Sequence, residues 1–245
     1  MAVEKIRGIV LKEINKGETS KNLIVLSKGI GKIFMYARGA RKSKSPLMAS
    51  SQIFSYCDFV AFENKNFYNI NQAEIIDNFY NIRTDIEKLA YSSYILELVE
   101  KTCPENMECD NIMLLLLKTL SVMSKIDINP RFITRVFEIK YMSLMGFMPE
   151  TENCVFCGND SHLNYFSKIE GGVMCDECKK KGIDGGIISN GALQSLRYIL
   201  KSDVSKVFNF RVSDDVLYEL SILSKDYISS HINMKFKTLD FAESL

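Results

Sequence analysis

Four cysteines form the clearest chemical pattern in this chain. They occur as two pairs, Cys154 with Cys157 and Cys175 with Cys178, and each pair encloses two residues. Two cysteines at this spacing can bind one metal ion from a tight turn, and a second pair completes a tetrahedral shell of thiolates. The 17 residues between the pairs fall within the range typical of such sites. The sequence therefore predicts one structural Zn²⁺ site.

A catalytic role for this metal is disfavoured, because four thiolates leave no coordination position open for water or substrate. The zinc-deaminase pattern is absent, since Met174 precedes Cys175 and Leu163 follows His162. A redox-active Cys-x-x-Cys pair is the alternative, although nothing thioredoxin-like surrounds either pair. The chain has three other cysteines, which we expect to be buried small apolar residues: Cys57, Cys103 and Cys109.

A second pattern is a cation-rich stretch that also contains glycine and serine. Four cations fall within the seven residues from 38 to 44: Arg38, Arg41, Lys42 and Lys44. An adaptable loop of this composition can follow a phosphate backbone with its cations, hydroxyls and backbone amides. We therefore predict that these four side chains contact DNA, with Lys32 and Arg7 as weaker contributors.

Two aromatic residues precede the cation-rich stretch. Phe34 and Tyr36 lie in a predicted strand, where their rings could stack on unpaired bases. The alternative interpretation is a solvated charged loop beside aromatic residues of the core, and for these two rings a core position is the expectation.

The net charge of +1 conceals an uneven distribution. Residues 1–45 contain eleven basic and three acidic side chains, a net charge of +8, which leaves −7 for the other 200 residues. Such a split indicates two modules with different partners. The basic segment favours nucleic-acid binding by the first module.

The hydrophobic pattern changes near residue 80. Five short runs with strand character precede this point: 6–11, 23–26, 33–37, 54–62 and 67–76. Short strands without helix-length patterns between them predict a small antiparallel barrel, and a five-stranded OB-fold is the closest standard form. We assign residues 1–80 to this nucleic-acid-binding domain.

Helical periodicity dominates the remaining 165 residues. Helices are predicted near residues 86–99, 112–126, 130–146 and 193–200, and a longer one after Ser213. Asn129 and Pro130 form a good helix start, with Asn as the cap and Pro at the first helical position. The fold class is therefore α+β: an OB-fold barrel followed by a helical domain, residues 81–245, with a zinc-binding insertion at about 150–186.

Several other classes of protein are disfavoured. The longest apolar run has six residues, Ile112 to Leu117, whereas a membrane-spanning helix needs about 20. Charged residues near the N-terminus replace the apolar stretch of a signal peptide, so we expect a cytoplasmic protein. We find no phosphate-binding loop, no Ser-His-Asp arrangement and no carboxylate cluster of a nuclease. We therefore expect neither catalysis nor a small-molecule substrate.

These features together resemble the RecO family of bacterial DNA repair proteins. The resemblance rests on the segment Ala37 to Ser45 in an OB-like module, the four-cysteine insertion in a helical module, and the tail Lys235 to Phe241. It extends over essentially the whole chain. The tail departs from the family pattern, with Thr238 where Ser is usual and Phe236 where Leu is common.

The resemblance implies a non-enzymatic mediator of DNA repair and homologous recombination. Such proteins bind single- and double-stranded DNA and anneal complementary strands. They act with RecR, and indirectly with RecA, which they help to load onto DNA coated by single-strand-binding protein (SSB). It also implies a cytoplasmic, nucleoid-associated location.

Three other functions remain open from the sequence. The chain could be a zinc-containing RNA-binding or transcription-associated OB-fold protein, a metal-dependent enzyme, or an adaptor whose basic surface binds an acidic protein.

Overall fold

Contacts between residues group the chain into two units. The computed structural model describes residues 3–64 and 67–245. The first unit comprises Met1–Asp127 with Phe236–Leu245, and the second comprises Ile128–Lys235. This division differs from the predicted boundary near residue 80, because two helices and the C-terminal segment group with the barrel.

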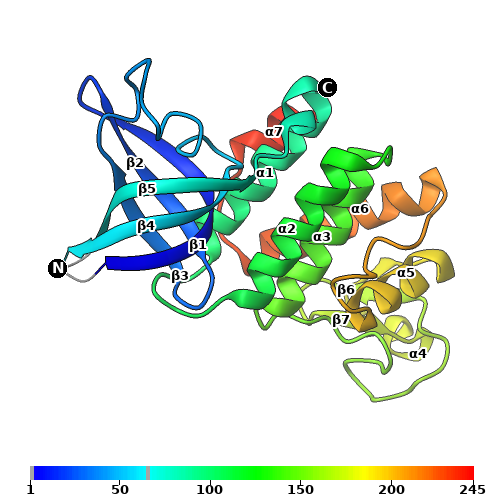
Figure 1. The fold of residues 1–245 in the computed structure, drawn as a ribbon. Coiled ribbons are helices and arrows are strands. Elements are labelled where there is room, and N and C mark those ends of the chain that lie inside the picture. The colour runs from blue at the N-terminus through cyan, green and yellow to red at the C-terminus, as the bar shows by residue number, and fades with distance from the viewer. Residues whose placement is uncertain (1–2, 65–66) are drawn as a thin grey trace. The chain divides into compact units, whose positions relative to one another are not determined.

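A closed barrel of five strands forms the first part of the first unit (Figure 1). The strand order β1-β2-β3-β5-β4 closes because β1 pairs with both β2 and β4. The strands are β1 (Val3–Lys16), β2 (Ser20–Ser27), β3 (Gly31–Ala37), β4 (Tyr56–Asn64) and β5 (Phe67–Asp77). The predicted five-stranded barrel is confirmed.

Alternation along the strands builds the barrel core. In β3, Ile33, Met35 and Ala37 are buried and point inward, whereas Phe34 is 40% exposed and Tyr36 is half-buried on the outer face. This period of two is what a curved sheet with one buried face requires. The sequence expectation that Phe34 lies in the core is therefore wrong: it occupies an outward position of its strand.

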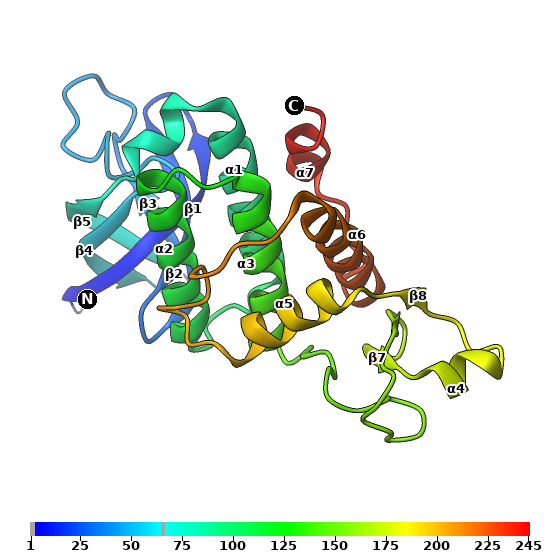
Figure 2. The same cartoon turned by 90° about the vertical axis from the view of Figure 1, so that its right-hand side faces the viewer.

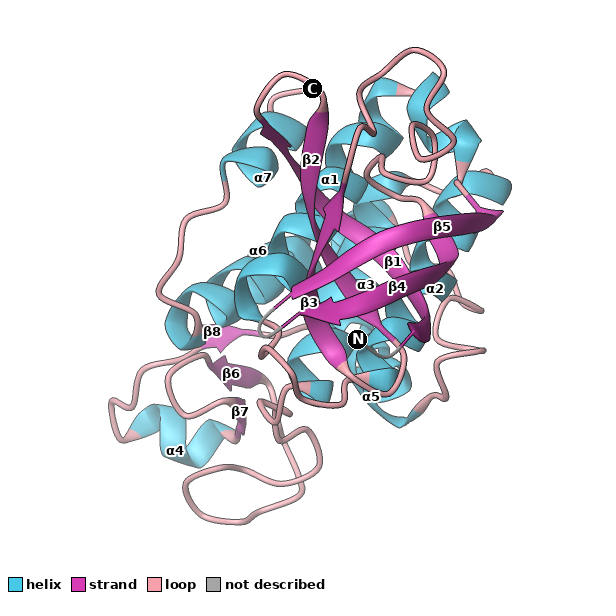
Figure 3. Ribbon diagram, turned by 60° about the vertical axis from the view of Figure 1, so that its left-hand side comes forward, coloured by secondary structure: helices cyan, strands magenta, loops and turns pink. Residues whose placement is uncertain are grey.

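One strand pair of the barrel is parallel and short. β3 meets β5 only at Met35 with Tyr68 and Tyr36 with Asn69, whereas the other pairs are longer and antiparallel. Figure 3 shows the strands crossing one another around the barrel. The β3–β5 contact, which closes the barrel on this side, therefore contains few paired residues.

Helices complete the first unit, in agreement with the two that the sequence predicts for this region. They are η1 (Tyr80–Thr84), α1 (Ile86–Thr102), α2 (Asp110–Lys125) and α7 (Lys237–Ala242). Asp85 caps α1, since its carboxylate accepts a hydrogen bond of 3.0 Å from the backbone N–H of Lys88.

The C-terminal segment docks on α1, and Figure 1 shows α7 beside this helix. The Phe236 ring contacts Tyr94 edge to face at 5.6 Å, and Lys101 Nζ lies 5.3 Å from the centre of the same ring. Thr238 donates a hydrogen bond from its hydroxyl to Glu97. Burial of Glu97 opposes its ionisation, but hydrogen bonds from Lys101 and Thr238 lower its pKa overall. Part of the tail thus belongs to the core of the first unit.

The second unit contains helices and one small sheet (Figure 2). Its elements are α3 (Pro130–Leu144), β6 (Tyr165–Ser167), β7 (Gly172–Met174), α4 (Asp176–Lys180), β8 (Gly186–Ile187), α5 (Asn190–Lys201) and α6 (Asp214–His231). Asn129 and Ser213 cap α3 and α6 through side-chain hydrogen bonds, as predicted. The sheet, of order β7-β6-β8, is an addition that the sequence pattern did not predict.

Across residues 3–64 and 67–245, no helix combines the length and the apolar character needed to cross a membrane.

Gly31 gives a testable constraint on the first unit. Its φ is +90°, and a Cβ atom there would lie 1.9 Å from the carbonyl oxygen of Met107. Nearby Gly29 has a similar φ of +77° but open space around it. We expect Gly29→Ala to cost about 1–2 kcal/mol of unfolding free energy from backbone strain alone. Gly31→Ala should cost about 2–4 kcal/mol because the steric clash is added. Urea denaturation of both variants measures the difference, and equal losses would contradict it.

Candidate metal centre and nucleic-acid interface

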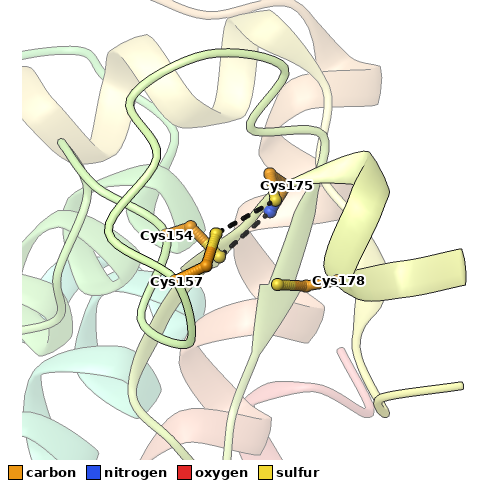
Figure 4. A group of neighbouring side chains, drawn as sticks. All are labelled: Cys154, Cys157, Cys175 and Cys178. Atoms are coloured by element: carbon orange, nitrogen blue, oxygen red, sulfur yellow. Dashed lines mark hydrogen bonds between the residues drawn. The ribbon is translucent and has the colours of Figure 1, made fainter. Parts of the chain in front are cut away.

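Two local turns bring the four predicted cysteines together in the second unit (Figure 4). Cys154 and Cys157 lie on a turn that Gly158 ends with a φ of +74°, where its N–H donates to Cys154 O at 2.8 Å. Cys175 directly follows β7 and is the N-cap of α4, and Cys178 lies within that helix. Because each pair is held by short-range structure, the two turns need only be brought face to face by the β6–β7 hairpin.

The cluster fits a tetrahedral metal ion. All four Sγ atoms lie within 4.8 Å of one another. Bonds of about 2.3 Å in a tetrahedral thiolate shell place sulfur atoms about 3.8 Å apart. The Sγ atoms of Cys157 and Cys175 are 3.6 Å apart, close to this value. The four residues could thus hold one metal ion without rearrangement of the backbone.

Backbone amides favour a thiolate in this cluster. Burial opposes ionisation of Cys154, but N–H groups of Cys175, Phe156 and Cys157 outweigh it and lower the pKa of the thiol to about 6. Burial and hydrogen bonds with the other thiols raise the pKa of Cys178 to about 12. The backbone amides therefore favour the thiolate of Cys154, the form that binds a metal, whereas Cys178 would lose its proton on metal binding.

The cysteines outside this cluster are buried, as predicted. Burial raises the pKa of Cys57 to about 12. The Sγ atoms of Cys103 and Cys109 lie 3.3 Å apart in the connection between α1 and α2. These thiols are packing residues of the first unit.

The cation-rich stretch is built from consecutive turns, so it is a shaped loop. Lys42 N–H donates to Gly39 O at 3.0 Å, and Ser45 N–H donates to Lys42 O at 2.9 Å. Ala40 and Leu47 are buried in the barrel core and anchor the loop from within. The structure therefore fixes the backbone while leaving the charged side chains on the outside.

The loop is also fastened to the turn between β1 and β2. Arg41 donates to Gly17 O at 3.0 Å through Nη1 and to Thr19 O at 2.8 Å through its backbone N–H. The N–H of Gly39 donates to the hydroxyl of Ser20 at 3.1 Å. The two connections thus form one surface at this end of the barrel.

The predicted DNA contacts differ in availability. Arg38, Arg41, Lys42 and Lys44 are exposed, and none forms an ion pair within the part of the chain that the structure describes. Arg7, in contrast, binds Asp58 through two hydrogen bonds of 2.7 and 2.6 Å, and this pairing lowers the pKa of Asp58. Lys32 is only 8% exposed and donates to Glu100 O at 2.7 Å. The four loop cations therefore carry the candidate interface, and Arg7 and Lys32 are already engaged.

The outside of the barrel has an aromatic cleft, and the sequence predicts only some of the residues that line it. Phe34 and Tyr36 line it as the sequence allowed, but Phe67, Lys16 and two asparagines also contribute. No local pattern marks these residues as a group, because the strands that carry them are distant in the sequence.

Comparison with known proteins identifies the family. Residues 1–79 match the family model described as the N-terminal part of Recombination protein O, and residues 83–240 match that of its C-terminal part. A protein of Acetivibrio thermocellus named DNA repair protein RecO is 38% identical over 98% of this chain and 96% of its own length. Proteins with the same name from Thermoanaerobacter sp. and Alkaliphilus metalliredigens are 35% and 37% identical over at least 98% of both chains. The chain therefore belongs to the RecO family.

Proposed function

We propose that this protein is a non-enzymatic mediator of DNA repair and homologous recombination that binds single- and double-stranded DNA. The observation that carries the proposal is the loop at residues 38–44, where four exposed cations lack an acidic partner among the described residues. An unpaired surface cation gains more from a phosphate than one that must first leave a carboxylate. Membership of a family named for DNA repair supports the same function.

Strand annealing follows from the kind of contact that the loop offers. Lysine and arginine side chains bind phosphates through charge and do not read bases, so the binding energy comes from released counterions. A protein that covers the backbones of two strands in this way lowers their mutual repulsion while leaving the base edges free to pair. We propose this as the mechanism of annealing.

We also propose that two parts of the chain bind different partners. The basic barrel binds DNA in the cytoplasm at the nucleoid, whereas the more acidic remainder of the chain binds proteins. By resemblance to the family these proteins are RecR and SSB, and RecA is loaded indirectly. The net charges of +8 before residue 46 and −7 after it support this division.

The proposed metal is one structural Zn²⁺ bound by Cys154, Cys157, Cys175 and Cys178. The four-thiolate donor set, closed to further ligands, supports a role in folding over one in catalysis.

An annealing assay tests the proposed function. Two complementary oligonucleotides, each coated with SSB, should form duplex faster with the protein than without it, because the protein places both backbones together. The control is the variant Lys42→Gln/Lys44→Gln, which should anneal more slowly. Equal rates with and without the wild-type protein would reject the proposal. Stronger binding to RNA than to DNA, without annealing, would instead favour an RNA-binding protein.

A further inference from the structure

The barrel carries a cleft of about 530 Å³ on its outer surface. Ligand-binding pockets typically have volumes of about 300–1,000 Å³, so this cleft is large enough for a ligand. Its lining comes from three barrel strands and the end of a fourth: Lys16, Asn22, Phe34, Met35, Tyr36, Phe67 and Asn69. Two phenylalanines of the lining are exposed, 40% for Phe34 and 38% for Phe67. The barrel therefore presents large apolar rings to solvent at a concave site.

Strand register explains why these side chains meet. Asn22 pairs with Tyr36, and Tyr36 pairs with Asn69, so one row crosses β2, β3 and β5. The parallel register between β3 and β5, extended by one residue, aligns Phe34 with Phe67. Residues aligned across strands share a face, so the two phenylalanines and Tyr36 lie on the same outward side. The cleft is thus an aromatic surface edged by two amides.

The chemistry of the lining matches that of an unpaired nucleobase. Aromatic rings stack on the faces of bases of any sequence, and side-chain amides can pair with base edges. Lys16 supplies a cation, and no acidic side chain lines the cleft within the described residues. A peptide would need a row of backbone hydrogen-bond partners, whereas the lining of this cleft is mainly aromatic, with two amides and one cation.

The cleft also adjoins the proposed phosphate-binding loop. Lys16 ends β1, and the next residue, Gly17, accepts the hydrogen bond from the Arg41 guanidinium. A strand whose bases lie in the cleft therefore has its phosphates within the same basic end of the barrel. The two sites together provide the groove and the stacking surface that single-strand-binding proteins combine.

We propose that the cleft stacks unpaired bases of single-stranded DNA, with Phe34, Tyr36 and Phe67 as the stacking surface. The inference rests on the proposed function and deepens it, because it separates single strands from duplexes. Bases of a duplex are stacked on one another and cannot enter the cleft, so only the loop cations contact a duplex. Affinity for single strands has a component that depends on bases and is independent of salt.

Phe34→Ala tests this inference, with Tyr80→Ala as the matched control. Tyr80 is an aromatic residue of the same unit that is 65% exposed and lies outside the cleft. Loss of one stacked base should weaken binding of oligo(dT) about 5- to 100-fold. Binding of a duplex and the log–log salt slope should stay unchanged, and Phe34→Tyr should retain most of the affinity. Tyr80→Ala should behave like the wild type in each measurement.

An abasic oligonucleotide completes the experiment, because it keeps the phosphates and lacks the bases. The wild-type protein should bind it more weakly than oligo(dT), and Phe34→Ala should not weaken its binding further. Equal affinity of Phe34→Ala and the wild type for oligo(dT) would overturn the inference, as would an equal loss for duplex and single strand. If the wild type binds no DNA at low salt, the proposed function itself fails, and the two failures are thus distinguishable.

Discussion

Replacement of both Lys42 and Lys44 by glutamine is expected to weaken single-stranded DNA binding about 20-fold at about 0.1 M salt. Each phosphate contact to a single strand contributes about 0.7 to the log–log dependence of the association constant on salt. The slope should therefore fall by about 1.4 for single strands and by about 1.8 for duplexes. Fluorescence anisotropy over a series of salt concentrations measures both quantities.

These two lysines are chosen because their side chains have no structural partner in the described residues. Arg41 is left unchanged, since its guanidinium donates to Gly17 O and its loss would also detach the loop from the β1–β2 turn. Glutamine keeps the length of the side chain and adds no negative charge. Any loss of affinity then reports phosphate contact and not a change in the shape of the loop.

A variant with the same change in net charge serves as the control. Lys28 and Lys206 are exposed lysines outside the loop, and neither has an ion pair in the described structure. Lys28→Gln/Lys206→Gln should shift affinity much less, because neither lysine belongs to the loop and nonspecific attraction between exposed charges is screened by salt. Equal losses for the two double variants would show that overall charge, and not the loop, determines binding.

The cysteine cluster and the barrel were predictable because their signals are local. Each cysteine pair is held by one turn, so spacing alone indicates the ligand set. The strands of the barrel alternate buried and exposed residues, and β3 shows this clearly from Ile33 to Ala37. The caps Asn129 and Ser213 marked helix starts for the same reason, since a cap acts within three residues.

What the sequence could not predict depends on pairing between distant segments. The cleft exists because β3 lies parallel to β5, which aligns Phe34 with Phe67 more than thirty residues later. Lys32 looked like a free cation, yet its burial and its bond to Glu100 O follow from the α1–α2 connection packing on the β2–β3 turn.

Two helices also have features that depend on distant segments and that the sequence pattern did not predict. α7 has only six residues and little intrinsic stability, and it is held by packing on α1 through Phe236 and Thr238. In α3, Arg135 and Glu138 are fully buried and form an ion pair in which Arg135 Nη1 donates to both carboxylate oxygens, at 2.9 and 2.8 Å. A charged pair three residues apart normally indicates a solvated helix face, so burial on this side was not predictable.

Loss of the proposed metal is expected to unfold the cysteine turns of the insertion while leaving the rest of the chain folded. The insertion has little other structure to support it, since β6, β7 and β8 have three, three and two residues. Short strands of this kind are marginal alone, whereas structural Zn²⁺ contributes about 10–16 kcal/mol in zinc-finger peptides. Cys154→Ser, or a strong chelator, should therefore abolish bound metal and remove hydrogen-exchange protection around residues 154–162 and 175–182.

Protection should decrease less in β6, because Phe166 also contacts Tyr227 of α6 edge to face at 6.0 Å. Cys57→Ala, a change at a buried thiol outside the cluster, should keep one metal per chain and the exchange pattern of the wild type.

DNA affinity should survive metal loss, since every contact that anchors the basic loop lies within the first unit. A fall in affinity as large as that of Lys42→Gln/Lys44→Gln would instead mean that the metal-bound insertion contacts DNA itself. A water ligand on the metal at the wild-type site would contradict the closed thiolate shell and reopen a catalytic role, because four thiolates leave no coordination position for water.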